Sequence, residues 1–344
     1  MSRYYDLTLT PPGAVLPVRE WTSHPGGSYD PGALNIEFDI TAYNFASPMG
    51  ASTITVEGVS LQDLSGAANI SGRAVPFAGM TLKLSGGMKK GLPLANPKQS
   101  GVLTTGSVYQ AFGNWQGTEM SLSLVIVSSP YTLSMPGNLV LSWPKGGTLS
   151  DALTLCLSTA YPGIPVSSQI SPNLISPENR TGYFSTLHQL AKTVNEMTIG
   201  AVGSGYTAYF QQDSLGQIVY PGVQITYRGG TIYCYDYTVT PAVVQLDFND
   251  LIGQPTWIAP NTIQIKTVLR ADIAVGSLIK MPVGYQSAAG LVSTTAAALP
   301  SYIRYSSIFQ GKFYVQALRH LGNFRGSGEQ WATIMNCVPA GSPT

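Results

Sequence analysis

A strict alternation of apolar and polar residues between Ala33 and Ala42 is the strongest constraint on how this 344-residue chain folds. Apolar side chains occupy every second position: Leu34, Ile36, Phe38, Ile40 and Ala42. The intervening positions carry Asn35, Glu37, Asp39 and Thr41. A period of two places one set of side chains on each face of a strand. The segment therefore predicts a half-buried β-strand.

Shorter segments of the same kind follow, each bounded by Gly, Pro, Ser or Asn. They lie at 53–56, 81–84, 121–127 and 139–143. The 37 glycines and 24 prolines exceed average usage and supply many turns. The chain up to about Lys145 is therefore predicted to be all-β.

The pattern then changes to a helical one. Thr148 and Asp151 form a capping-box-like start, and Tyr161-Pro162-Gly163 ends the segment. The apolar stripe between them is Leu149, Ala152, Leu153, Cys156, Leu157 and Ala160. A second helix is predicted from about Ser185, with Leu187, Leu190, Ala191, Val194 and Met197 at helical spacing.

After Gly205 the pattern is β again. Strands are expected at 206–210, 217–220, 223–227, 231–239, 243–248, 262–269, 277–281, 312–318 and 331–335. Gly229-Gly230 is a good hairpin turn. The order of β block, small helical insert and β block argues against a doubly wound α/β fold, which needs regular alternation of strand and helix.

Charged residues are scarce. Asp, Glu, Lys and Arg make up 10% of the chain, where about 25% is usual. Charge is depleted and Tyr enriched in interface cores, and this chain has 19 Tyr. The composition favours permanent burial against neighbouring subunits, although a secreted β-protein has a similar one. A net charge of +1 gives no global attraction to nucleic acid or to anionic membrane.

No standard catalytic or phosphate-binding motif occurs, so no cofactor and no enzymatic activity are expected. His24, His188 and His320 are scattered, and metal binding is not expected. Two suitably spaced carboxylates would suffice for a glycosidase, and that spacing is invisible in a sequence. The acids weighed for this role are Asp213, Asp236, Asp247, Asp250 and Asp272, for which turn and strand-end caps are the favoured interpretation.

Cys156, Cys234 and Cys337 are odd in number and far apart. We interpret them as reduced core thiols of a chain made in a reducing compartment. No secretory signal and no apolar run of about 20 residues is evident, so no membrane insertion is expected.

One basic, glycine-rich segment is a candidate docking loop. Its residues are Gly86, Gly87, Met88, Lys89, Lys90 and Gly91, followed by a proline-containing stretch to Pro97 that forbids an ordinary helix. A solvated hairpin or long loop is the simpler interpretation, and docking to a neighbouring subunit or ring is the functional one. The five Trp residues are expected to be core or interface anchors rather than carbohydrate contacts.

Several stretches resemble baseplate hub proteins of contractile-tailed bacteriophages. They are Thr53–Leu64, Gly86–Pro97, Gly106–Ile126, Asp250–Ile258, Val268–Gly276 and Gly311–Arg325, with Trp331. The collinear order carries the resemblance, because no single motif is diagnostic and no residue-level repeat relates the two β blocks.

The resemblance implies a mainly β fold with a small α/β insert, in which two tail-tube-like β-barrel or sandwich domains flank a middle domain. The expected divisions are 1–146, 147–230 and 231–344. It implies a homotrimer that joins the six-fold tail tube protein to the three-fold central spike protein, with DNA passing through the lumen without specific binding. The expected location is the virion baseplate, after synthesis in the host cytoplasm; contacts with tape-measure and baseplate wedge proteins are left open.

Two other functions remain as alternatives at this point. One is a tail-associated cell-wall hydrolase, because the acidic residues are unassigned. The other is a carbohydrate- or receptor-binding tail module, because of the Trp and Tyr content.

Overall fold

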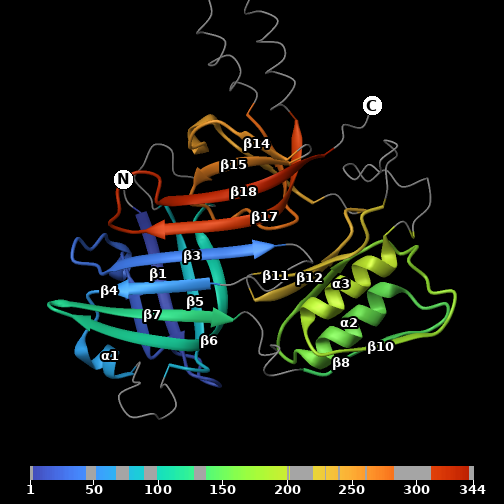
Figure 1. The fold of residues 1–344 in the computed structure, drawn as a ribbon, viewed down its shortest axis with the longest axis horizontal. Coiled ribbons are helices and arrows are strands. Elements are labelled where there is room, and N and C mark those ends of the chain that lie inside the picture. The colour runs from blue at the N-terminus through green and yellow to red at the C-terminus, as the bar shows by residue number, and fades with distance from the viewer. Residues whose placement is uncertain are drawn as a thin grey trace, which may run out of the picture.

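In the computed structural model, antiparallel β-sheet dominates the chain, and two helices of 12 residues pack beside it (Figure 1). The structure describes residues 3–43, 52–66, 77–88, 99–127, 137–199, 201, 220–228, 230–238, 241–259, 262–282 and 311–340. The mainly β class expected from the sequence is confirmed.

The first β unit, formed by the described residues from 3 to 127, is a seven-stranded antiparallel sheet in the order β2-β1-β5-β6-β7-β4-β3. Its elements are β1 (Arg3–Thr10), β2 (Arg19–Thr22), η1 (Pro25–Gly27), β3 (Asn35–Tyr43), β4 (Ser52–Glu57), α1 (Leu61–Gly66), β5 (Thr81–Met88), β6 (Gly101–Gln116) and β7 (Glu119–Val127). Inward-facing residues from all seven strands form one buried cluster. The sheet therefore curls around a common core.

The second β unit, formed by the described residues from 241 to 340, has the antiparallel order β14-β15-β18-β17-β16, and β13 pairs in parallel with β16. Its elements are β13 (Val243–Gln245), η3 (Phe248–Asp250), β14 (Thr256–Ala259), β15 (Thr262–Val268), β16 (Leu278–Lys280), β17 (Lys312–Asn323) and β18 (Trp331–Ala340). It has a buried cluster of its own that includes Ile263, Val315 and Met335.

The two β units repeat the same topology. The order β3-β4-β7-β6-β5 in the first matches β14-β15-β18-β17-β16 in the second, and the matched strands follow one another identically along the chain. Each hairpin carries one bulge, after Val108 in β6 and after Val315 in β17. Just before these bulges, each strand exchanges backbone hydrogen bonds with a turn that contains a glycine with positive φ, Gly79 or Gly276.

The paired bulges align the rest of the repeat. Val108 lies opposite Ile126 in the first unit, as Val315 lies opposite Cys337 in the second. One strand further along, Ile126 lies opposite Ser52 of β4, and Cys337 lies opposite Ile263 of β15. The two units are thus equivalent residue by residue around these bulges, whereas the register shifts after Leu84 and after Trp257 have no counterpart in the matching pair of the other unit.

The units are joined by direct strand pairing, which we call the internal joint. After its bulge, β17 pairs antiparallel with β3, from Ala317 opposite Tyr43 to Asn323 opposite Glu37. Figure 1 shows β14, β15, β18, β17, β3, β4, β7 and β6 following one another from top to bottom. One continuous sheet therefore runs through both β units.

The middle unit, formed by the described residues from 137 to 238, packs its helices against two small sheets, β10-β8 and β11-β12-β9. Its elements are β8 (Leu139–Trp143), α2 (Leu149–Ala160), β9 (Val166–Gln169), β10 (Arg180–Phe184), α3 (Leu187–Thr198), β11 (Gln224–Arg228) and β12 (Thr231–Tyr235). The Thr148 hydroxyl accepts the Asp151 backbone N–H at 3.2 Å, so the predicted helix cap is confirmed. The second predicted helix is also confirmed and begins after Thr186.

Most expected strands are confirmed; β5, β17 and β18 are longer than expected, and β12, β13, β15 and β16 are shorter. The structure adds β1, β2, β6, β9, β10 and β14, and a short helix α1 inside the block expected to be all-β. The expected strand at 206–210 lies outside the described residues, as does that at 217–220 except for Tyr220. The predicted hairpin is present as β11-β12, and β12 also pairs with β9. This pairing keeps 231–235 with the middle unit, past the expected division at 230.

Candidate assembly interface

Strand β6 has different neighbours along its two halves. Gly101–Ser107 lie beside β5 on one edge, whereas Gln110–Gln116 have β7 as their strand partner among the described residues. The side chains of Phe112 and Trp115 are exposed on this second half, Trp115 by 64%. We call Gln110–Gln116 the β6 edge. A strand edge of this kind presents N–H and C=O groups that suit pairing with another chain.

Strand β14 forms one end of the continuous sheet. It pairs with β15, and all four of its residues are exposed. Trp257 is 44% exposed and Ile258 49%. We call Thr256–Ala259 the β14 edge. An aromatic and a β-branched residue at an exposed edge are typical of a surface that another chain covers.

Neither edge carries the charges that protect exposed strands from association. Proteins usually place Lys, Asp or Glu on an edge strand to prevent pairing. The β6 edge reads Gln-Ala-Phe-Gly-Asn-Trp-Gln and the β14 edge reads Thr-Trp-Ile-Ala. The scarcity of charge in the whole chain thus recurs at these two edges.

The internal joint shows how such edges are held together in this fold. Arg319 of β17 binds Asp39 of β3 in a bidentate ion pair, with Nε–Oδ1 at 2.8 Å and Nη2–Oδ2 at 2.5 Å. The Asn323 amide donates a hydrogen bond to Glu37. Arg3 of β1 donates to the carbonyl oxygens of Asn323, at 2.5 Å, and Gly326, at 2.6 Å. Strand pairing and side-chain bonds therefore both stabilise the joint.

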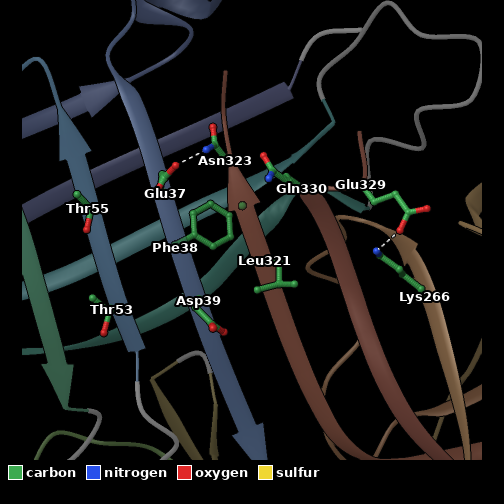
Figure 2. Close-up of a pocket in the computed structure, with 11 residues that line it drawn as sticks. Glu37, Phe38, Asp39, Thr53, Thr55, Lys266, Leu321, Asn323, Glu329 and Gln330 are labelled. Atoms are coloured by element: carbon green, nitrogen blue, oxygen red, sulfur yellow. Dashed lines mark hydrogen bonds and ion pairs between the residues drawn. The ribbon is translucent and has the colours of Figure 1, made fainter. Parts of the chain in front are cut away.

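A shallow depression of about 520 Å³ lies over the internal joint (Figure 2). Thr53 and Thr55 line it from β4, and Lys266 of β15 forms an ion pair with Glu329 at 2.5 Å. The other carboxylates in it, Glu37 and Asp39, are bound to Asn323 and Arg319 as described above. Each of these three carboxylates therefore has a partner within the chain, and the contacts hold the joint together.

The segment expected to be a docking loop begins as a core strand. Gly86, Gly87 and Met88 are the last residues of β5, opposite Tyr5, Tyr4 and Arg3 of β1. The Gly87 carbonyl accepts a hydrogen bond from the buried Trp331 indole at 2.9 Å. A Cβ on Gly87 would lie 2.8 Å from the Ser100 Cα, so the backbones meet closely there.

Its first three residues therefore belong to the packed sheet, which corrects the expectation that the loop starts at Gly86. The sequence pattern predicted a strand only to residue 84, because Ser85, Gly86 and Gly87 are poor strand formers. Lys89, Lys90 and Gly91 lie outside the described residues. Their docking role stays a prediction.

A buried ionic cluster accounts for two of the acids weighed as hydrolase residues. Arg270 is 2% exposed and donates to Asp250 at 2.9 Å and to Asp272 at 2.7 and 2.8 Å. The Gln99 amide donates to Asp250 at 2.7 Å, which ties the segment before β6 to the second β unit. Both carboxylates raise the pKa of Arg270 although its burial acts in the opposite direction.

Asp236 has a structural role in the middle unit. Its carboxylate is fully buried and accepts the Ser171 backbone N–H at 2.6 Å and the Tyr220 hydroxyl at 2.7 Å. Its other oxygen accepts the Thr238 N–H at 2.9 Å. Asp247 begins the short η3 turn and is exposed, while Asp213 lies outside the described residues. The expected turn role fits Asp236 and Asp247, whereas Asp250 and Asp272 also form the buried ion pairs with Arg270.

The histidines and cysteines do not converge on a site. No group of three His, Cys, Asp or Glu residues able to hold a metal occurs among the described residues. Burial lowers the pKa of His320 to about 3, and its Nδ1 lies 2.9 Å from the Thr333 hydroxyl. All three cysteines are free and buried, and burial raises the pKa of Cys156 to about 11. Such thiols are unreactive.

The five tryptophans divide between the core and the two edges. Trp21, Trp143 and Trp331 are buried, whereas Trp115 and Trp257 are exposed. The sequence pattern predicts core or interface anchors but does not distinguish the buried tryptophans from the exposed ones. Only the topology shows that one exposed Trp lies at each end of the strand row from β14 to β6. In the part of the chain described, no helix is long and apolar enough to cross a bilayer.

Solved structures of tail proteins match nearly the whole chain. The tail protein from Neisseria meningitidis MC58 matches with a TM-score of 0.53 at 11% identity, covering 97% of this chain and 96% of its own. The 43 kDa tail protein of prophage MuSo2 from Shewanella oneidensis matches with a TM-score of 0.53 at 9% identity, covering 98% of each chain. The chain has a phage tail-protein fold.

The same fold occurs in a secretion apparatus. The E. coli c3393 protein, a component of the type VI secretion system with structural similarity to the T4 tail proteins gp27 and gp5, matches with a TM-score of 0.50 at 9% identity. The match covers 98% of this chain and 79% of that one. No family model and no curated protein sequence matches the chain. The phage tail-protein resemblance inferred from the sequence is therefore confirmed at the level of the fold.

Proposed function

We propose that the protein is a structural baseplate hub of a contractile phage tail, a trimeric adaptor that joins a six-fold tail tube to a three-fold central spike. One observation carries the proposal: a single chain contains two β units of equivalent topology and pairing, joined strand to strand. Three such chains present six equivalent β units, which match a six-fold tube, while each chain has only one middle unit. The assembly keeps three-fold symmetry toward the spike.

The composition supports permanent assembly. A closed ring buries much of each subunit, and a 10% charge content leaves few ions to desolvate on burial. The exposed aromatics at the two strand edges supply apolar interface area. The net charge of +1 suits a lumen through which DNA passes without specific binding. The proposed location is the virion baseplate, with the tube and spike proteins as partners.

The proposed organisation assigns the two β units to the ring and the middle unit to one flank. Each unit has a main buried cluster, although that of the first also contains Leu269, Phe324 and Trp331 of the second, and this supports three domains close to the divisions 1–146, 147–230 and 231–344. The pairing of β8 with β10 moves the first division from 146 to before Leu139. The pairing of β12 with β9 extends the middle domain to Tyr235.

The native mass of the purified protein tests the proposal. Light scattering is measured on the protein alone and mixed with a candidate spike protein. We expect an assembly of three chains, about 110 kDa from the 36.5 kDa chain, or its complex with the spike. A chain that remains monomeric in both conditions would contradict the hub function.

A further inference from the structure

We propose that the β6 edge of one copy pairs antiparallel with the β14 edge of a second copy, in the register that the internal joint already shows within the chain. This places Gly113 opposite the second copy's Trp257 and Asn114 opposite its Thr256. The inference deepens the proposed function and rests on it, because it names the surfaces through which the copies of a hub ring meet.

The position of each residue on β6 follows from the paired bulges. Tyr109 is the extra residue in β6, and Gln316 is the extra residue in β17. Counting four residues onward from each bulge makes Gly113 the equivalent of His320. In the internal joint, His320 lies opposite Ile40 of β3. The partner of Gly113 is therefore the β14 residue that is equivalent to Ile40.

The position on β14 follows from its pairing with β15. Ile40 lies opposite Ser52 in the first unit, and Trp257 lies opposite Ile263 in the second. Ser52 and Ile263 hold equivalent places, as shown by their partners before the two bulges. Trp257 is therefore the equivalent of Ile40. The register of the copy-to-copy pairing follows from this equivalence once the pairing repeats the internal joint.

The sizes of the side chains agree with this register. In the internal joint, Ile40 and His320 are both of medium size and both buried. At the equivalent positions of the copy-to-copy pairing, the large Trp257 side chain faces Gly113, which has no side chain. The ring of Trp257, 44% exposed in the single chain, gains a covered position over a residue without a side chain.

A second pair shows the same exchange in reverse. Phe38 lies opposite Gly322 in the internal joint, and its ring fills the space of the missing Cβ, which would lie 2.1 Å from Phe38 Cζ. The equivalents by the same count are Pro255 and Trp115. Here the large residue, Trp115, lies on β6, and its partner Pro255 is a buried residue that directly precedes β14. At this position too, a large aromatic side chain faces a smaller residue, and it lies on the opposite strand from the aromatic of the internal joint.

The pairing is head to tail, because the two edges differ. Each copy offers one β6 edge and one β14 edge, so it binds two neighbours. A heterologous contact of this kind closes into a ring when the rotation allows it. In such a ring the strand row from β14 to β6 continues from copy to copy, and the exposed edges disappear.

A designed disulfide tests the register. The pair Asn114→Cys and Thr256→Cys is introduced in one chain; both positions are exposed, and the native cysteines are buried. Residues directly opposite in an antiparallel pair have Cα atoms about 4.5–5.5 Å apart, within the range of a disulfide. The matched control is Gln110→Cys with Thr256→Cys, which the register places four residues, or roughly 13 Å, out of line.

We expect the first variant to give intermolecular disulfides up to a covalent trimer on a non-reducing gel, with the 114–256 linkage found by mass spectrometry, and the control to give none. The register would be overturned if light scattering shows trimers but the two variants cross-link equally, or neither cross-links. That result would leave the hub function standing. A monomer even with the spike protein would overturn both.

A rescue experiment tests the fit of Trp257 on Gly113. Gly113→Leu adds a side chain at an exposed position of the single chain and should weaken self-association by about tenfold or more, the scale of overpacking a buried contact. Gly113→Leu with Trp257→Ala should recover most of that loss, because every joint then has room for the added side chain. Equal association of Gly113→Leu and the native protein, or no recovery in the double variant, would overturn the proposed contact.

Discussion

Removing the Arg270 side chain charge should destabilise the fold more than any exposed ion pair can. Arg270 is 2% exposed and donates three hydrogen bonds to Asp250 and Asp272. In Arg270→Met, the Asp250 carboxylate keeps the Gln99 amide but loses its counter-ion while only 4% exposed. Leaving such a charge unpaired costs about 3–5 kcal/mol.

Urea unfolding followed by circular dichroism measures this cost. With an m-value of about 3 kcal/mol/M, the expected loss lowers the midpoint by about 1–1.7 M. The matched control is Lys266→Met, which breaks the exposed Lys266–Glu329 pair and should cost about 0–1 kcal/mol. If Arg270→Met loses no more stability than Lys266→Met, the argument that this cluster ties the first β unit to the second fails.

Three further predictions concern the buried histidine, the first helix cap and the segment that follows β5. Burial lowers the pKa of His320 to about 3, from an unfolded value of 6.5. The free energy of unfolding that this group contributes is therefore fully present above pH 6.5 and should fall as the pH drops toward 3. His320→Gln should flatten that part of the curve of unfolding free energy against pH. Thr148→Ala removes the N-cap bond to Asp151 and should lower the unfolding free energy by about 0.5–2 kcal/mol in the same urea assay, whereas Thr148→Ser should retain most of it. Deleting residues 89–97, after the end of β5, should abolish tail assembly in phage complementation while the isolated protein keeps its native circular dichroism spectrum; normal tails would refute the docking role of Lys89 and Lys90.

Local sequence patterns predicted the elements whose structure depends on residues close together in the chain. The alternation from Ala33 to Ala42 gave β3 because every second residue faces one core. Thr148 gave the start of α2 because a cap bond spans only three residues. Strand β1 was missed although Tyr5, Leu7 and Leu9 alternate in the same way, since polar Tyr and Thr residues blur the contrast in Arg3–Thr10.

The repeat of the two β units could not be predicted because few equivalent residues are alike. Gly79 matches Gly276 where a turn needs positive φ, and Val108 matches Val315 before each bulge. Other equivalent places carry unrelated residues, such as Gly113 and His320. Backbone pairing is what repeats, and hydrogen bonds between main chains place little demand on side-chain identity.

The candidate interface could not be predicted from the sequence for a related reason. An edge strand is defined by which strand is missing beside it, and that depends on pairings far apart in the chain. The low charge and the Tyr content of the sequence did indicate a protein that assembles with neighbouring subunits. The exposed Trp115 and Trp257 in the structure point to the same kind of surface. The sequence could not say which residues of the chain form the edges.

Electron microscopy of the purified assembly tests the central claim most directly, namely that each chain supplies two equivalent β units to one ring. The account predicts three chains arranged around a lumen, with six β lobes of equal size in the ring and three middle units outside the pseudo-six-fold pattern. A ring with another number of chains, or a trimer in which the two β units of a chain occupy inequivalent places, would contradict it.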